Sequence, residues 1–256
     1  MALHWDWHIR LVDENGNTEK ECWRKNMVHN LGEQLLLQGT FGTLTVLEAD
    51  ALYDQAGHGD GAKCLHSASG ADDPFSTVAA GDYLYLVGGS DNEVTAGSYV
   101  VASVGGDDEN VLLSADPYAG DVAGGIVVLP GRRLEIALDA RTSPAEADVI
   151  GQMEAYEEDG TGYARVAVDP DVADTWTIAL DTTTSDYKAT SAQVEFAATA
   201  ADWQTNYNAS IVARTTAAED IATSVLVATC PFPEGYTVGN GKSLYIDVYV
   251  RLGEES

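Results

Sequence analysis

Four acidic residues form the densest group of side chains that could do acid–base chemistry. Glu154, Glu157, Glu158 and Asp159 precede Gly160. A glycoside hydrolase needs two carboxyl groups held in a cleft with separated pKa values. The chain contains 41 Asp and Glu residues, however, so groups of this density arise by chance. The composition therefore favours a solvated acidic loop, and no catalytic residue is predicted here.

The acidic stretches are also the places where a hard cation such as Ca²⁺ would find oxygen ligands. Residues 107–109, Asp-Asp-Glu, form a second such stretch besides 154–159. Neither stretch has the ligand spacing of an EF-hand loop. The sequence leaves open whether a cation binds at these acidic loops, and no cofactor is predicted.

Thiol and imidazole donors occur together once, where His58 and His66 flank Cys64 in a glycine-rich segment. Zinc accepts these donors, but a tetrahedral site normally shows a second spaced pair, which is missing. His4 and His8 would complete a set of four only if the fold brought them there. No metal site is predicted.

The sequence contains none of the short motifs typical of nucleophilic catalysis or nucleotide binding. There is no Gly-x-Ser-x-Gly elbow, no Walker-type phosphate loop and no strand-associated Gly-x-Gly-x-x-Gly. The three cysteines are an odd number without paired spacing, so we expect no disulfide framework. We predict that the protein is not an enzyme.

Only segment 25–37 has a clear helical period. Met27, Leu31 and Leu35 recur every four residues, and Asn26 is a suitable N-cap. We therefore predict one principal helix here, with its apolar face against a sheet. Most of the remaining chain alternates apolar and polar residues or carries turn signals at short intervals. Strands are predicted at 5–12, 18–24, 78–89, 97–104, 110–114, 125–129, 134–138, 163–168, 175–180, 194–196, 209–214, 224–228 and 243–252.

The texture of the chain changes between residues 43 and 130, which are rich in Gly, Ala, Ser and Asp. Closely spaced strands with Gly/Asp turns indicate a small antiparallel barrel or sandwich. We predict that 43–130 is inserted into an outer domain made of 1–42 and 131–256. The predicted fold class is mostly β, an antiparallel β-sandwich with one principal helix and an inserted small β-barrel or sandwich.

The strongest signal in the composition is charge: 13 Lys and Arg against 41 Asp and Glu, a formal net charge of −28. Nucleic acid and anionic membranes are disfavoured as partners because both need a positive surface. Acidity spread through every turn favours adaptation to molar salt, where self-repulsion is screened. The N-terminus lacks a signal-peptide pattern and no apolar run reaches about 18 residues, so we expect synthesis in a cytoplasm and no membrane span.

Tryptophans are the main candidates for contact with a partner. Exposed rings stack on sugars or anchor protein interfaces, whereas buried rings fill a core. Trp5 and Trp7 share one strand face, Trp23 lies in the returning strand and Trp203 lies late in the chain. These four residues are the predicted interface candidates.

Several short motifs, in their order, resemble a loose family of structural proteins from tailed viruses. The motifs are Lys25-Asn26-Met27-Val28 with Asn30-x-Gly32, the strand 134–138, the run 157–165, the residues Trp176, Phe196 and Trp203, and the closing segment 239–244. Similar chains are β-sandwich proteins on the capsid exterior or on the tail, and they act by assembly and attachment. The resemblance covers about 1–42 and 131–252, and 43–130 departs from it as an outward-facing module.

The resemblance implies a virion protein, made in the host cytoplasm and assembled with other virion proteins. The favoured interpretation is a capsid decoration or turret subunit that self-associates as a trimer or pentamer. One alternative is a tail or baseplate protein whose partner is a host surface receptor or glycan. Another is a carbohydrate-binding or carbohydrate-active β protein that uses the aromatic residues and the acids at 154–159.

Overall fold

The computed structural model describes residues 2–25, 27–28, 47–58, 62–67, 74–88, 94–95, 97–105, 110–118, 120, 122–168, 176–181, 186–217 and 224–253. Over these residues the protein is mostly antiparallel β-strand with one short helix. The chain divides into two compact units. Unit 1 comprises Met1–Leu37, Leu134–Ala213 and Ser224–Ser256, and unit 2 comprises Gln38–Arg133 and Arg214–Thr223.

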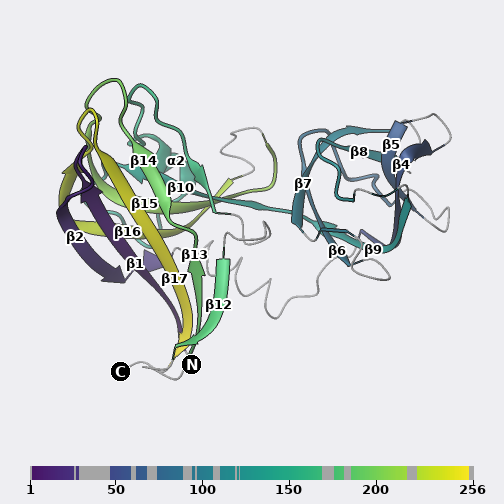
Figure 1. Ribbon diagram of the computed structural model, residues 1–256, viewed down its shortest axis with the longest axis horizontal. Helices are drawn as coiled ribbons and strands as arrows, with labels where there is room; N and C mark the ends of the chain where they lie inside the picture. The colour runs from purple at the N-terminus through teal and green to yellow at the C-terminus, as the bar shows by residue number, and fades with distance from the viewer. Residues whose placement is uncertain are drawn as a thin grey trace. The chain divides into compact units, whose positions relative to one another are not determined.

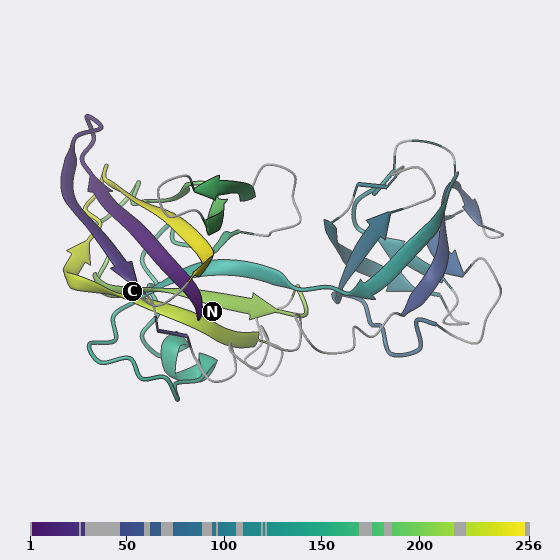
Figure 2. The ribbon, with the colours of Figure 1, turned by 90° about the horizontal axis from the view of Figure 1, so that it is seen from below.

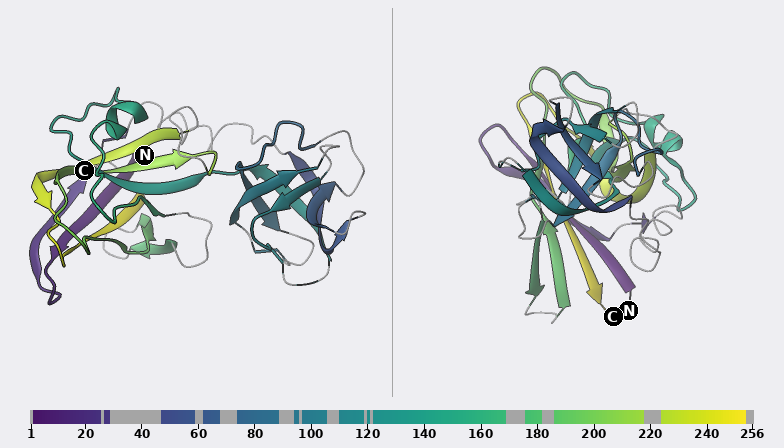
Figure 3. Two further views of the ribbon diagram at one scale, coloured as in Figure 1. Left: turned by 90° about the horizontal axis from the view of Figure 1, so that it is seen from above. Right: turned by 90° about the vertical axis from the view of Figure 1, so that its right-hand side faces the viewer.

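Unit 1 contains a six-stranded antiparallel sheet in which β1 and β17 are neighbours. Its strands follow the order β12-β13-β17-β1-β2, and β14 also pairs with β17; β12, β13, β17 and β1 lie side by side in the right panel of Figure 3. The alternation of apolar residues sets the register, because Ile9 lies opposite Ile246 and both side chains are fully buried. The strands are β1 (Ala2–Val12), β2 (Thr18–Lys25), β12 (Trp176–Asp181), β13 (Asp186–Ser191), β14 (Val194–Ala197) and β17 (Ser243–Gly253).

A second sheet of unit 1 has the strand order β11-β10-β15-β16-β3 (Figure 1). Apolar side chains of both sheets meet in one core, to which the first sheet contributes Trp7 and Phe196 and the second contributes Ile136, Ile211 and Cys230. Burial of these large side chains is the main stabilising contribution to the unit. The strands are β3 (Met27–Val28), β10 (Arg133–Asp139), β11 (Val166–Ala167), β15 (Thr205–Arg214) and β16 (Ser224–Thr237).

The outer face of the second sheet is covered by the segment between β10 and β11, which contains the helix α2 (Ile150–Glu154), as Figure 2 shows. We call residues 140–165 the covering segment. Ile150 and Met153 are the buried residues of this helix. They form a small second core with three apolar residues of the sheet, namely Ala137, Val212 and Leu226. The covering segment thus shields this face from water.

A buried polar network lies beside this small core. Asp139 is fully buried, and its carboxylate accepts hydrogen bonds from Arg141 Nε (2.9 Å) and Nη2 (3.0 Å). It also accepts hydrogen bonds from Asn208 Nδ2 (2.8 Å) and Ser210 Oγ (2.9 Å). Arg141 Nη1 donates to Asp148 Oδ2 at 2.8 Å. The network therefore ties β10 and β15 to the covering segment through charges that are paired as well as buried.

Unit 2 is built around a closed antiparallel barrel with the strand order β4-β5-β8-β7-β6-β9. Leu65, Phe75, Leu86 and Ile126 lie fully buried in its core. Tyr53 is also buried, and its hydroxyl donates a hydrogen bond to Asp116 Oδ1 at 2.5 Å. The strands are β4 (Glu48–His58), β5 (Ala62–Ser67), β6 (Tyr83–Gly88), β7 (Gly97–Val104), β8 (Asn110–Leu113) and β9 (Val122–Pro130).

Residues 214–217, which are the last residue of β15 and the three residues after it, also belong to unit 2. The amide of Tyr83 donates to Thr215 O at 2.9 Å, and the amide of Ala217 donates to Gly81 O at 2.6 Å. The insertion predicted over 43–130 did not include this segment. The residues that follow β15 are therefore hydrogen-bonded to the unit that contains the barrel.

The mostly β, antiparallel character predicted from the sequence is confirmed, and the inserted region contains a barrel. The predicted start of the principal helix is wrong, because Met27 and Val28 form β3 and pair with Thr229 and Ala228. Residues 26 and 29–37 of that prediction lie outside the described residues. Residues 62–66 of the glycine-rich segment around Cys64 belong to β5, which pairs with β4.

Candidate functional site

Among the interface candidates whose side chains are described, Trp23 is the one that lies on the surface. It belongs to β2, opposite His8 of β1, while the next residue pair, Cys22 and Ile9, faces the core. Alternation along a strand therefore places Trp23 and His8 on the outer face of the six-stranded sheet. The Trp23 side chain is 58% exposed, which is unusual for so large an apolar group.

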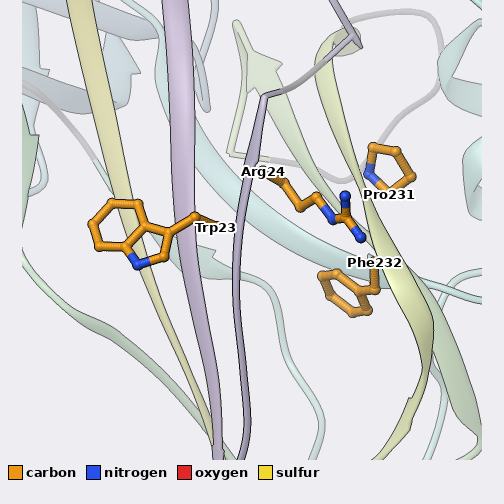
Figure 4. A pocket seen from close by; sticks show the side chains of 4 residues that line it. All are labelled: Trp23, Arg24, Pro231 and Phe232. Atoms are coloured by element: carbon orange, nitrogen blue, oxygen red, sulfur yellow. The ribbon is translucent and has the colours of Figure 1, made fainter.

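The indole of Trp23 is held in one position by two other rings. It stacks on the His8 ring at 4.3 Å between centroids with an interplanar angle of 11°, and on Tyr249 at 5.4 Å and 27°. Tyr249 is in turn capped by Lys188, whose Nζ lies 4.7 Å from the ring centroid. Figure 4 shows Trp23 extending from β2 across β1. Two rings thus pack against the indole while Trp23 keeps more than half of its surface exposed.

Two carboxylates lie beside the His8 ring, which stacks on Trp23. His8 Nε2 lies 2.7 Å from Glu21 Oε1, and His8 Nδ1 lies 3.4 Å from Asp247 Oδ2. Gln193 Nε2 lies 3.3 Å from both oxygens of Asp247. These contacts orient the carboxylates, and Glu21 is 51% exposed. We call His8, Glu21, Trp23, Asp247 and Tyr249 together the Trp23 surface.

A pocket of about 590 Å³ adjoins Trp23 on the other side of β2. Its described lining consists of Trp23, Arg24, Pro231 and Phe232, and Figure 4 shows Trp23 and Arg24 projecting from β2 in opposite directions. Lys20, farther along β2, is held to β16 by an ion pair with Glu234 at 3.1 Å. The pocket therefore lies where the edge of β2 approaches β16.

The other tryptophan candidates occupy different environments. Trp7 is fully buried in the core of unit 1, so it is not available at the surface of this chain. Trp203 is also buried, and its Nε1 donates to Thr161 O at 3.2 Å. Trp5 lies in β1 opposite Val250, and its side chain is outside the described part.

The acidic group at 154–159 is not the solvated loop that the composition favoured. The Arg165 guanidinium binds Glu157 through two contacts, Nε–Oε1 at 2.8 Å and Nη2–Oε2 at 2.6 Å, and binds Glu154 Oε1 at 2.9 Å. Glu158 is buried and accepts hydrogen bonds from Asn206 Nδ2 and from the amide of Gly160, both at 2.7 Å. These carboxylates hold the covering segment in place.

Tyr163 joins this acidic group to β10. Its hydroxyl accepts a hydrogen bond from the Leu138 amide at 2.9 Å and donates to Glu157 Oε1 at 3.1 Å. Burial, followed by the negative charge of Glu157, raises the pKa of the Tyr163 phenol well above its ordinary value near 10.

The raised pKa of Tyr163 predicts alkaline destabilisation. Its stabilising contribution is fully present below pH about 10, the pKa of the unfolded chain, and is lost as pH rises beyond that because only the unfolded state releases the proton. In a titration followed at 295 nm, exposed tyrosines should ionise first, and Tyr163 should ionise only with unfolding. The variant Tyr163→Phe should titrate one tyrosine fewer in the late step. Ionisation of every tyrosine near pH 10 with the fold intact would contradict the prediction.

Of the candidate metal ligands, His58, Cys64 and His66 lie in unit 2, whereas His4 and His8 lie in β1 of unit 1. Cys64 and His66 are buried in β5, and His66 Nδ1 lies 3.2 Å from Ser67 O. His58 ends β4, and its side chain lies outside the described part. Within the described residues no group of three or more His, Cys, Asp or Glu side chains is placed to hold a metal ion.

Comparisons with protein-family models, curated proteins and solved structures found no match for this chain. In the described part of the chain, no helix combines the length and apolar character needed to cross a membrane. The fold and the site define a mostly β chain of two units whose first unit carries an exposed aromatic surface. The resemblance to tailed-virus proteins rests on the sequence motifs alone.

Proposed function

We propose that the protein is a structural component of a tailed-virus particle, a capsid decoration or turret subunit on the particle exterior. The observation that carries the proposal is that the two units differ in whether their sheets have free edges. Unit 1 has sheets with edge strands, whereas the barrel of unit 2 is closed. Edge strands offer backbone groups for pairing with another chain, and closure removes such edges.

Unit 1 supplies the proposed assembly surfaces. Among the described strands, β2 and β12 end one sheet and β11 and β3 end the other. We interpret the two sheets with their shared core as a β-sandwich. In the proposed particle, this scaffold contacts other virion proteins and further copies of itself as a trimer or pentamer, and the barrel unit faces solvent.

The formal net charge of −28 fits a particle protein of a salt-loving host. The Debye length falls from about 10 Å at 0.1 M salt to about 3 Å at 1 M, so repulsion among the acids weakens. We expect the melting temperature to rise by several degrees between about 0.1 M and 2 M KCl, measured by circular dichroism. NaCl of equal ionic strength should act alike, since screening depends on ionic strength. A flat salt profile would rule out this adaptation.

Immunogold electron microscopy tests the proposal. An antibody raised against residues 43–130 is applied to tailed-virus particles purified from a culture that produces the protein. Gold over the head is the expected result, and gold confined to the tail tip would instead indicate a tail or baseplate attachment protein. Absence of the protein from the particles, checked by mass spectrometry of the same preparation, would refute both placements.

The carbohydrate-active alternative receives less support from the acids than the sequence suggested. Glu154 and Glu157 are paired with Arg165, and Glu158 is buried against Asn206. A hydrolase would need two of these carboxyl groups free to meet a substrate. The proposal therefore gives them a role in the fold, and a reducing-sugar assay on the purified protein should show no hydrolysis.

A further inference from the structure

We propose that the Trp23 surface binds one pyranose ring of a neutral glycan. This inference goes beyond the proposed particle role and does not depend on it. The exposed indole is its centre, and the carboxylates of Glu21 and Asp247 beside it are its hydrogen-bonding groups.

The first step of the argument is the shape of the indole. His8 and Tyr249 support the ring at 4.3 Å and 5.4 Å, so the stacked position does not have to be organised when a ligand arrives. At 58% exposure, Trp23 keeps more than half of its surface accessible to a ligand. A pyranose presents C–H groups on one face, and such groups pack against the electron-rich face of an aromatic ring.

The second step is the polar rim. Glu21 Oε1 lies 2.7 Å from His8 Nε2 and Asp247 Oδ2 lies 3.4 Å from His8 Nδ1, while Gln193 Nε2 lies 3.3 Å from both oxygens of Asp247. Carboxylate oxygens accept hydrogen bonds, and sugar hydroxyls donate them. Lys188, stacked over Tyr249, adds a donor on the same face. The surface thus combines one apolar platform with a few oriented polar groups, as binding sites for small polar ligands do.

The third step is charge. The chain has a formal net charge of −28, and two carboxylates lie within the site itself. This field repels uronic acids, sialic acids and sulfated sugars. A neutral glycan meets no such repulsion, so the charge selects it among carbohydrates.

The fourth step weighs a protein partner. A stable protein interface buries upward of about 1,000 Å² around an apolar centre. The residues that contact the outer-face rings are mostly charged, and within unit 1 the other large apolar side chains exposed in the described part, Val149 and Tyr156, lie at α2. These two residues belong to the segment that covers the second sheet. The surroundings of Trp23 therefore fit a small polar ligand better than a protein.

The test is glycan binding by the full chain and two matched variants. The protein is applied to an array of neutral and anionic oligosaccharides at about 0.1 M KCl, where its charge is little screened, and hits are quantified by titration calorimetry. Trp23→Ala should weaken binding about tenfold or more, as expected for loss of a stacked aromatic contact. Tyr156→Ala removes an aromatic ring of equal exposure, 57%, at α2 and should leave the affinity unchanged. Circular dichroism establishes that both variants fold.

Four outcomes would overturn the inference: no glycan bound at millimolar concentration, a preference for anionic glycans, affinity unchanged in Trp23→Ala, or equal loss in both variants. A Trp23→Ala protein that is missing from particles while the parent binds no glycan would make Trp23 a protein contact and leave the particle proposal standing. Glycan binding by a protein that is absent from particles would refute the particle proposal and support this one.

Discussion

Replacing Asp139 with alanine is expected to lower the free energy of unfolding of unit 1 by about 3–5 kcal/mol, the cost of breaking a buried ion pair from one side. The Asp139 side chain is fully buried, and the Arg141 side chain is only 6% exposed. Without the carboxylate, the guanidinium keeps a single acidic partner, Asp148, and cannot regain water. Asn208 and Ser210 also lose an acceptor, and each unsatisfied buried group adds to the loss.

Urea unfolding followed by circular dichroism measures the effect, and Glu146→Ala is the control. Glu146 is an exposed acid of the same covering segment, and its removal should change the stability by less than about 0.5 kcal/mol. The double variant Asp139→Leu with Arg141→Met should recover part of the loss, because buried pairs are often replaced by apolar residues with little cost. If Asp139→Ala and Glu146→Ala behave alike, the network does not stabilise unit 1.

The strands of unit 1 were predictable where one face of a strand is buried and the other is wet. In β1 and β17 the apolar residues recur with period two, and the register Ile9–Ile246 follows from burying both sets against the same core. In unit 2 this signal is weaker, and β4 and β5 were missed. Ala51 and Ala123 line the barrel core as small side chains, so its strands contain fewer large apolar residues to reveal a period.

At Met27 and Val28, within the segment 25–37 that has a helical period, strand pairing overrides the local pattern. Met27 and Val28 fit a helix face, but Val28 is β-branched and favours a strand when a partner strand is present. The partner is β16, where Ala228 lies opposite Val28. That contact joins residues 200 positions apart, so no local window of sequence contains it.

The candidate site was partly predictable for the same reason. Trp23 was identified as one of four candidate tryptophans, but its exposure depends on its lying on the outer face of the six-stranded sheet, which the pairing of β1 with β2 shows. His8 and Tyr249 lie on the polar faces of predicted strands, and the cross-strand register was the missing information. The network around Asp139 could likewise not be predicted, because its partners Asn208 and Ser210 belong to a strand that is distant in the sequence.

Replacing Arg165 with methionine is expected to destabilise unit 1 by about 3–5 kcal/mol, because two carboxylates then face each other without a cation. Arg165 is 5% exposed and contacts Glu157 at 2.6 Å and Glu154 at 2.9 Å. Arg165→Lys should recover only part of the loss, since an ammonium group cannot reproduce the two-point contact with Glu157.

The control for Arg165 is an ion pair of similar length on the surface of the same unit. Lys242 Nζ lies 2.6 Å from Glu19 Oε1, and both side chains are about one-third exposed. Lys242→Met should therefore change the stability by no more than about 1 kcal/mol in the same urea titration. Combining Arg165→Met with Glu157→Gln removes one of the unpaired charges and should restore stability relative to Arg165→Met alone. If the combined variant is no more stable than Arg165→Met, the loss of stability comes from the packing of the arginine side chain. In that case the carboxylates of Glu154 and Glu157 do not need the charge of Arg165 to be accommodated in the fold.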